Sequence, residues 1–220
     1  MQNVTILGMV LQDRTTEEAL VTANRFLRNS AVDIVVFVDC DALLRAEKEV
    51  EIKELLSQAA MVEWTDKKLL EIADIKGDNR AAEVSERRLL KSLLKNIADI
   101  GGGVAVAGAS TESIDKLREE LMQLEPSINL IHDAVLENPG DGIPEEDING
   151  INEHAPALIV SRMDYGVLYK WLRQSKSMIN AGIWLVIPEH MSILSNKEKS
   201  IFMKVRHSIR CSMLRRRAGR

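Results

Sequence analysis

The most constraining feature of this sequence is a regular alternation of short apolar runs with longer segments of helical period. The apolar runs are Val4–Met9, Ile34–Val38, Met61–Trp64, Val104–Ala107, Asn129–Ile131, Leu158–Val160 and Ile183–Ile187. Several of them are apolar at consecutive positions, which is typical of parallel strands buried on both faces. The alternation therefore predicts an α/β fold of the Rossmann-like kind, with a mostly parallel sheet and helices on both of its faces.

The segments between these runs carry helical signals. Thr15 or Thr16 can cap a helix whose first turn contains Glu17 and Glu18. Apolar spacing predicts further helices over Ala42–Ser57, Lys67–Ile75, Ser85–Ala98, Thr111–Leu124, Glu145–Glu153, Val167–Ser175 and about Asn196–Arg217. Because 220 residues suffice for one well-buried core, we expect one α/β domain over residues 1–195, followed by a basic amphipathic helix over residues 196–220.

Cysteine and histidine spacing predicts neither a disulfide framework nor a metal site. Cys40 and Cys211 lie far apart and belong to no ligand-spaced pair, and no two of the four histidines are spaced to share a metal ion. No cofactor is predicted. The N-terminus lacks a basic region followed by a long apolar stretch, and no eighteen apolar residues run together. We therefore expect a cytoplasmic protein without a signal peptide or a transmembrane helix.

Charge is segregated along the chain, whose formal net charge is −4. Lys and Arg concentrate from Lys197 to Arg220, which argues against a nucleic-acid-binding body and indicates a basic tail. Its helix interleaves apolar residues with the cations Lys204, Arg206, Arg210, Arg215, Arg216 and Arg217. Two interpretations remain open. The helix could lie on an anionic membrane surface, at the inner face of the membrane, or it could pack on the domain with its charges in water.

Three aspartates follow predicted strands. Asp39 and Asp41 come after Ile34–Val38, and Asp66 follows Met61–Trp64. Ligands of α/β folds usually bind at the carboxyl ends of parallel strands, where a carboxylate could act as a general base. The alternative, which we favour, is that Asp41 and Asp66 cap the helices that follow.

A small-residue turn follows another strand and opens a helix. Gly108-Ala109-Ser110-Thr111 comes directly after Val104–Ala107. Such a turn can bring backbone N–H groups close to a phosphate. The glycine spacing matches neither the dinucleotide fingerprint nor the P-loop, so a plain tight turn is the favoured alternative.

The order of these segments resembles the WecG/TagA/CpsF family of bacterial glycosyltransferases over nearly the whole chain. The opening strand is similar in Val4–Gly8, the "LLGG" strand in Val104–Gly108, and the "KWI" segment in Lys170-Trp171-Leu172. The resemblance implies transfer of an N-acetylhexosamine from UDP to a lipid-linked acceptor.

The departures from the family pattern fall where the family keeps its chemistry. Its "TxN" turn reads Phe37-Val38-Asp39, and its "PDG" reads Trp64-Thr65-Asp66 when the flanks are matched without a gap. Its later "GxD" reads Glu86-Arg87-Arg88, and the glycines of "GxGxPxQE" fall on Arg162 and Asp164. Because any side chain at a phosphate-approach glycine blocks the backbone, these changes predict obstruction of a nucleotide sugar bound in the family manner.

The pattern leads to two functional hypotheses. The favoured one is a divergent, catalytically inactive glycosyltransferase-like protein that acts through protein contacts, with an active homologue or with itself, in polysaccharide or glycolipid assembly. The alternative is an active enzyme with a remodelled site. In that alternative Asp66 or Asp39 is the base, Arg162 or Arg88 holds the diphosphate of the UDP-sugar, and Gly108 and Ser110 contribute contacts.

Overall fold

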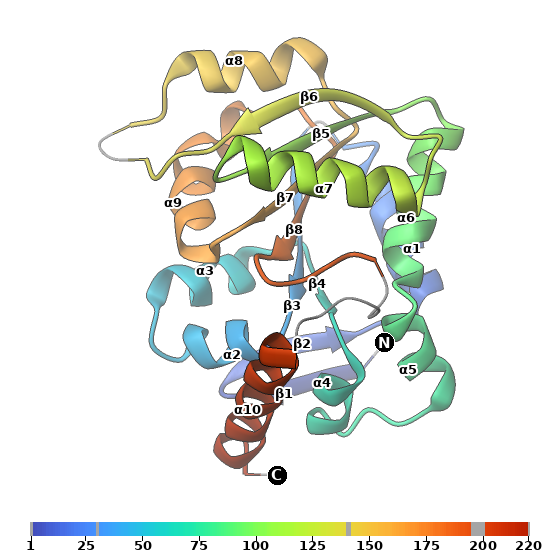
Figure 1. The fold of residues 1–220 in the computed structure, drawn as a ribbon, viewed down its shortest axis with the longest axis vertical. Coiled ribbons are helices and arrows are strands. Elements are labelled where there is room, and N and C mark those ends of the chain that lie inside the picture. The colour runs from blue at the N-terminus through green and yellow to red at the C-terminus, as the bar shows by residue number, and fades with distance from the viewer. Residues whose placement is uncertain (1, 30, 140–141, 195–200, 220) are drawn as a thin grey trace.

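The computed structural model describes residues 2–29, 31–139, 142–194 and 201–219. Within this part of the chain, six strands form a parallel sheet in the order β4-β3-β8-β7-β5-β6 (Figure 1). Their bounds are β3 Asp33–Val38, β4 Met61–Trp64, β5 Gly103–Gly108, β6 Asn129–Val135, β7 Leu158–Met163 and β8 Ile183–Pro188. The predicted α/β fold with a parallel sheet is confirmed.

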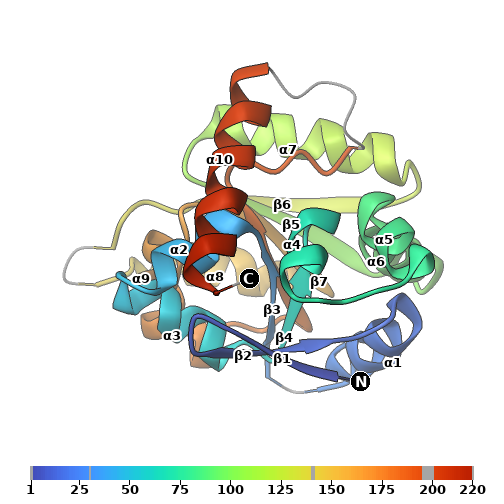
Figure 2. The same ribbon diagram turned by 90° about the horizontal axis from the view of Figure 1, so that it is seen from below.

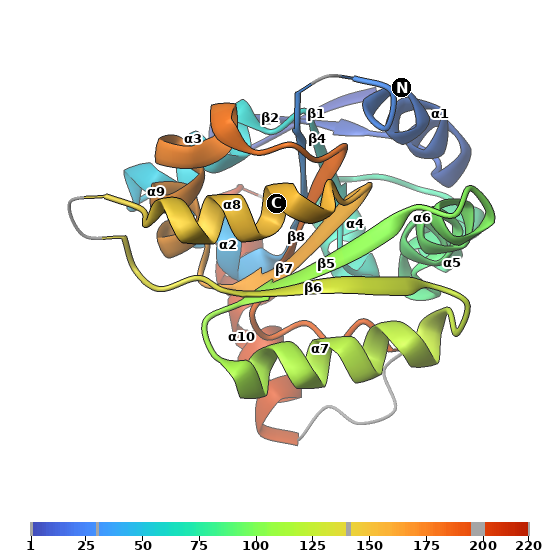
Figure 3. The same cartoon turned by 90° about the horizontal axis from the view of Figure 1, so that it is seen from above.

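Helices cover both faces of the sheet. They are α1 Thr16–Phe26, α2 Cys40–Ala46, α3 Val50–Gln58, α4 Lys67–Ile72, α5 Asp78–Ser85, α6 Arg88–Asp99, α7 Thr111–Leu124, α8 Glu145–His154, α9 Tyr165–Ser175 and α10 Ile201–Arg217. Successive side chains of β3 point to opposite faces of the sheet and so contribute to two different cores. Val36 packs into the core built with α2, α3 and α9, whereas Val35 packs into the core built with α1, α6 and α7. Figure 3 shows α2, α3 and α9 on one side of the sheet and α1 and α6 on the other.

The N-terminal apolar run is a hairpin and not a single strand. β1 Gln2–Ile6 pairs antiparallel with β2 Met9–Asp13, and Figure 2 shows this pair crossing beside β4. Leu7 and Gly8 both have positive φ, 49° and 76°, as a two-residue hairpin turn of type I′ requires. The prediction of one strand over Val4–Met9 is therefore wrong.

Two predicted helices are each interrupted. Ala42–Ser57 is divided between α2 and α3, and Ser85–Ala98 between α5 and α6. The second break falls at Arg87, whose φ of 57° is left-handed and ends the α5 register. By contrast, Thr111–Leu124 is confirmed at both ends as α7.

The C-terminal helix lies against the carboxyl edge of the sheet. α10 contacts α2 and α4, and its own residues Cys211 and Leu214 are buried in this contact. The predicted start at Asn196 lies outside the described residues. Val205, Ile209 and Met213 are 50%, 55% and 39% exposed, so much of the predicted apolar side faces outward. None of the described helices is both long and apolar enough to cross a membrane.

Candidate functional site

A small cavity lies where β3, β4 and β8 end. It is lined by Asp39, Asp41, Thr65, Asp66, Arg87, His190, Met191, Arg206, His207 and Arg210. The three strands are adjacent in the sheet, so their carboxyl ends bring together residues far apart in sequence. The cavity has a volume of about 50 Å³, which is room for a few water molecules.

Asp39 follows β3 and begins α2. Its Oδ1 accepts a hydrogen bond from the Ala42 amide at 2.8 Å, so Asp39 is the helix cap. The prediction that Asp41 caps this helix is wrong, since Asp41 lies in the first turn and pairs with Arg210. Burial raises the pKa of Asp39, and the hydrogen bond from Ala42 only partly opposes that rise.

Asp66 follows β4 and caps α4, as predicted. Its Oδ1 accepts from the Leu69 amide at 3.1 Å, and its Oδ2 lies 3.1 Å from His207 Nε2. Burial acts to raise the pKa of Asp66, but the hydrogen bonds and charge of His207 and the backbone N–H groups of Lys68 and Leu69 lower it on balance. Asp66 is therefore an ionised and already partnered carboxylate.

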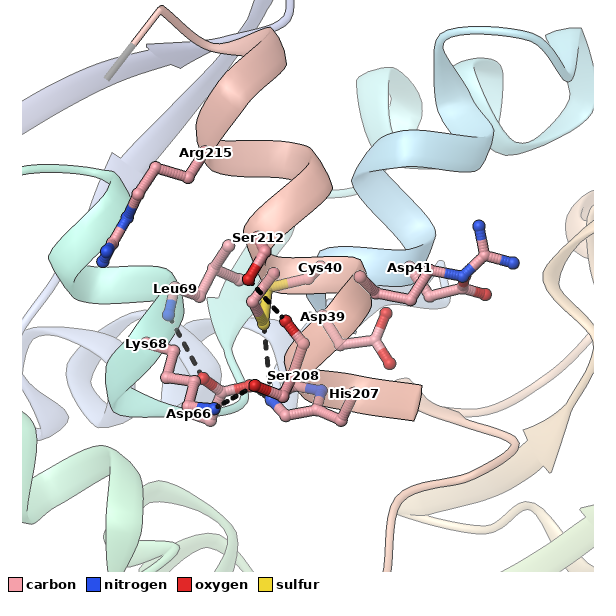
Figure 4. The surroundings of a disulfide bond; sticks show 12 residues. Asp39, Cys40, Asp41, Asp66, Lys68, Leu69, His207, Ser208, Ser212 and Arg215 are labelled. Carbon is pink, nitrogen blue, oxygen red and sulfur yellow. Dashed lines mark hydrogen bonds and ion pairs between the residues drawn. A yellow bond between two sulfur atoms is a disulfide. The ribbon is translucent and has the colours of Figure 1, made fainter. Parts of the chain in front are cut away.

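Helix α10 covers this pair of carboxylates. Arg210 Nε lies 2.8 Å from Asp41 Oδ1, and Arg217 forms an ion pair with Glu47. A disulfide between Cys40 and Cys211 joins α10 to the start of α2 (Figure 4). The prediction that no disulfide is present is therefore wrong. The two cysteines are 171 residues apart, so no local spacing could indicate the pairing.

Arg87 forms part of the cavity wall, which the sequence did not indicate. Its Nη1 donates to the carbonyl oxygens of Thr65 and Val84, and its Nε has no hydrogen-bond partner among the described residues. Burial lowers the pKa of Arg87, although the charge of Asp66 opposes the shift. The guanidinium thus ties the α5–α6 break to the end of β4.

The two arginines proposed for the diphosphate lie elsewhere. Arg162 is buried, with Nη1 2.9 Å from Glu120 Oε2 of α7. Arg88 is on the surface, with Nε 2.9 Å from Glu86 Oε2. Neither lines the cavity beside Asp39 and Asp66.

The turn after β5 is tightly packed. A Cβ on Gly108 would lie 2.6 Å from Ser113 Oγ, so the close packing against α7 explains the glycine without a bound phosphate. The Ser110 hydroxyl accepts from the Ser113 amide, and the Ser113 hydroxyl accepts from the Ser110 amide. This reciprocal capping gives the amides of Ser110 and Ser113 partners within the chain and favours the tight-turn interpretation.

A wider groove opens beside the cavity, between α2 and α10. Its volume is about 430 Å³, and it shares Asp41, His190, Arg206 and Arg210 with the cavity. Other cations that line it are Arg45, Lys48 and Arg217. Arg45 pairs with Glu49 and Asp164, whereas Arg206 and Lys48 form no ion pair with a described residue. Lys204 is not placed here, because its side chain lies outside the described part of the chain.

Comparison with known proteins places the chain in a family. A model of the glycosyl transferase WecG/TagA/CpsF family matches residues 4–206, from the N-terminal hairpin into α10. The chain belongs to the WecG/TagA/CpsF family. A search of the curated proteins finds no significant match. Membership gives the chain a glycosyltransferase-like character and connects it with polysaccharide assembly, and the match includes the strand ends that carry Asp39 and Asp66.

The structure brings together part of the residue set that the sequence singled out. Asp39, Asp66, Arg206 and Arg210 meet around one cavity, whereas Arg162, Arg88, Gly108 and Ser110 do not. Sequence reasoning missed Arg87, His190 and His207. Of these only His207 had a usable signal, since it stands four residues before Cys211 and therefore on the same face of a helix.

Proposed function

We propose that this WecG/TagA/CpsF family member is a glycosyltransferase-like protein without transfer activity, which acts through protein contacts in the assembly of a cell-surface polysaccharide or glycolipid. One observation carries the proposal. The cavity beside Asp39 and Asp66 measures about 50 Å³, whereas pockets for small molecules measure roughly 300–1,000 Å³. Its roof is α10, which a disulfide attaches to the rim.

The carboxylates of the cavity are engaged in ways that oppose base catalysis. A general base has to reach the proton that it removes, with a pKa near the working pH. The pKa of Asp66 is lowered, and its carboxylate is held by His207. The pKa of Asp39 is raised, but this partly buried side chain is engaged as the cap of α2. Both side chains therefore support the local structure at the positions where an enzyme would keep a base free.

The exposed face of α10 supports the contact role. Val205, Ile209 and Met213 recur at intervals of four residues, so they form an apolar stripe along one side of the helix. An exposed apolar stripe with basic neighbours is suited to a protein partner. The partner that we propose is an active homologue of the family or a second copy of this chain.

The groove favours a second candidate function, an active glycosyltransferase with a remodelled site. Its volume of about 430 Å³ falls in the range of ligand pockets, and Arg206 and Lys48 are not engaged in ion pairs with described residues. Arginine is well suited to bind a diphosphate. In this candidate, Arg206 and Arg210 take the role first assigned to Arg162 and Arg88, and Asp66 is the base.

Calorimetric titration of the purified chain with UDP and with UDP-N-acetylhexosamines separates the two. The proposal predicts no binding at millimolar nucleotide. Binding that Arg206→Ala abolishes would favour the second candidate. The control is Arg118→Ala, since Arg118 is a partly exposed arginine on α7 that pairs with Asp133 and does not line the groove.

A further inference from the structure

Four side chains with metal-binding atoms meet under α10. Asp66, His207 and Cys211 each offer one ligand atom, and these atoms all lie within 4.8 Å of one another. Cys40 joins the group because its sulfur is bonded to that of Cys211 (Figure 4). The four come from the end of β4, the start of α2 and the middle of α10.

The spacing of these atoms suits a tetrahedral zinc ion. Zn–S bonds of about 2.3 Å and Zn–N or Zn–O bonds of about 2.0 Å place neighbouring ligand atoms about 3.3–3.8 Å apart. Cys211 Sγ lies 3.5 Å from His207 Nε2, and His207 Nε2 lies 3.1 Å from Asp66 Oδ2. Small shifts of Asp66, His207 and Cys211 are therefore sufficient to admit the ion, whereas Cys40 Sγ has to move away from Cys211 Sγ after the disulfide is broken.

The surroundings also suit a closed site. Cys40 is fully buried and Cys211 is 5% exposed, while the side chains of His207 and Asp66 are 27% and 24% exposed. Asp66 Oδ1 accepts from the Leu69 amide, whereas Oδ2 faces His207 Nε2, so Oδ2 is the oxygen that a metal between the two side chains would take. His207 and Cys211 are four residues apart on one helix, a spacing that directs both side chains to the same side.

We propose that these residues form a Zn²⁺ site when the Cys40–Cys211 disulfide is reduced. A dithiol reductant breaks the S–S bond and is itself oxidised to a disulfide, leaving two thiols on the protein. Zn²⁺ then binds both sulfurs as thiolates, and their two protons pass to solvent. Coordination through His207 Nε2 also releases to solvent the proton that this nitrogen holds toward Asp66. The neutral imidazole of His207 and the carboxylate of Asp66 then complete four protein ligands, the number found in structural zinc sites.

The site gives α10 two alternative attachments to the domain. The disulfide joins α10 to α2 alone, whereas the zinc ion joins α10 to both α2 and the end of β4. Reducing compartments keep cysteines as thiols, and in such a compartment the metal is the attachment that remains. This inference is independent of the proposed function, because metal uptake involves no sugar nucleotide.

The test compares the oxidised and the reduced full-length chain. The chain is reduced with a phosphine, desalted without oxygen and titrated with Co²⁺ and then with Zn²⁺. The reduced chain is expected to bind one metal ion and to show the thiolate-to-cobalt charge-transfer band, which zinc then removes. The oxidised chain is expected to show neither. Equal uptake in both states, or a reduced chain that stays metal-free at equimolar zinc, overturns the proposal.

Variants locate the ligands. Cys211→Ser and His207→Ala are each expected to weaken zinc binding on the order of 100-fold or more. Even substitution of a residue that only hydrogen-bonds to a metal ligand lowers metal affinity about 10–100-fold. The matched controls are Ser212→Ala on α10 and His190→Ala in the cavity wall, which should bind zinc as the wild type does. Unchanged affinity in His207→Ala contradicts the assignment. If a variant does not fold, the comparison of the two redox states of the wild type still decides.

Discussion

Loss of the Cys40–Cys211 disulfide is expected to destabilise the fold strongly. The bond closes a loop of most of the 220-residue chain, since the two cysteines are 171 residues apart. In the chain-entropy account, a loop of this length restricts the unfolded chain by about 5 kcal/mol at 25 °C. With a urea dependence of about 2–3 kcal/mol per molar, the unfolding midpoint should fall by roughly 2 M.

The assay is equilibrium urea unfolding of the oxidised chain, the reduced chain and the Cys40→Ser/Cys211→Ser variant, all in the presence of a chelator. Fluorescence of the buried Trp171 and Trp184 reports on the core between β8 and α9, and circular dichroism reports on the helices. The reduced chain and the double variant serve as controls for each other, because only the variant places a hydroxyl at a buried position. Coinciding midpoints for the oxidised and reduced chains would refute the reasoning.

Three further predictions follow from buried charge and from α10. Burial raises the pKa of Glu63 to about 8 despite Arg80 and Arg14, so the folded chain binds a proton that the unfolded chain releases above about 4.5. Stability should therefore fall as the pH rises from about 5 to 8, and Glu63→Gln should flatten this dependence in urea titrations at several pH values; an equally steep dependence in the variant would contradict it. Arg162→Ala should cost about 3–5 kcal/mol in chemical unfolding because it leaves Glu120 buried without its partner, whereas Arg118→Ala at an exposed pair should cost less than about 1 kcal/mol; similar losses would argue against the buried-pair account. If α10 also binds an anionic membrane surface, deletion of Lys204 to Arg220 should abolish sedimentation with anionic liposomes, and unchanged sedimentation would rule that role out.

The sheet was predictable because its signal is local. Runs such as Ile183–Ile187 are short, rich in β-branched residues and apolar at every position, as a strand buried on both faces requires. The N-terminal hairpin was not predicted, because its turn, Leu7-Gly8, lies inside an apolar run and lacks the polar residues that usually mark a turn. The break at Arg87 was not predicted for a different reason. The left-handed Arg87 donates a hydrogen bond to the carbonyl oxygen of Thr65, which is 22 residues away and so outside any local sequence pattern.

Only the part of the site that depends on local sequence was predictable. Asp39 and Asp66 follow from the rule that ligands gather at the carboxyl ends of strands. Arg162 was assigned to the diphosphate because it falls on a glycine of the family's "GxGxPxQE" pattern, but it lies within β7 and forms a buried ion pair with Glu120 of α7. The disulfide and the contact of His207 with Asp66 both depend on how α10 packs against α2 and the end of β4. Local sequence does not specify this tertiary packing.

The most direct test of the proposed function is UDP release from UDP-N-acetylhexosamines in the presence of a lipid-linked acceptor, measured on the oxidised and reduced chains. The account predicts no release above the rate without protein in either redox state, because α10 leaves room for only a few water molecules beside Asp39 and Asp66. Release that depends on the chain and is lost in Asp66→Asn would contradict it and would establish the remodelled enzyme.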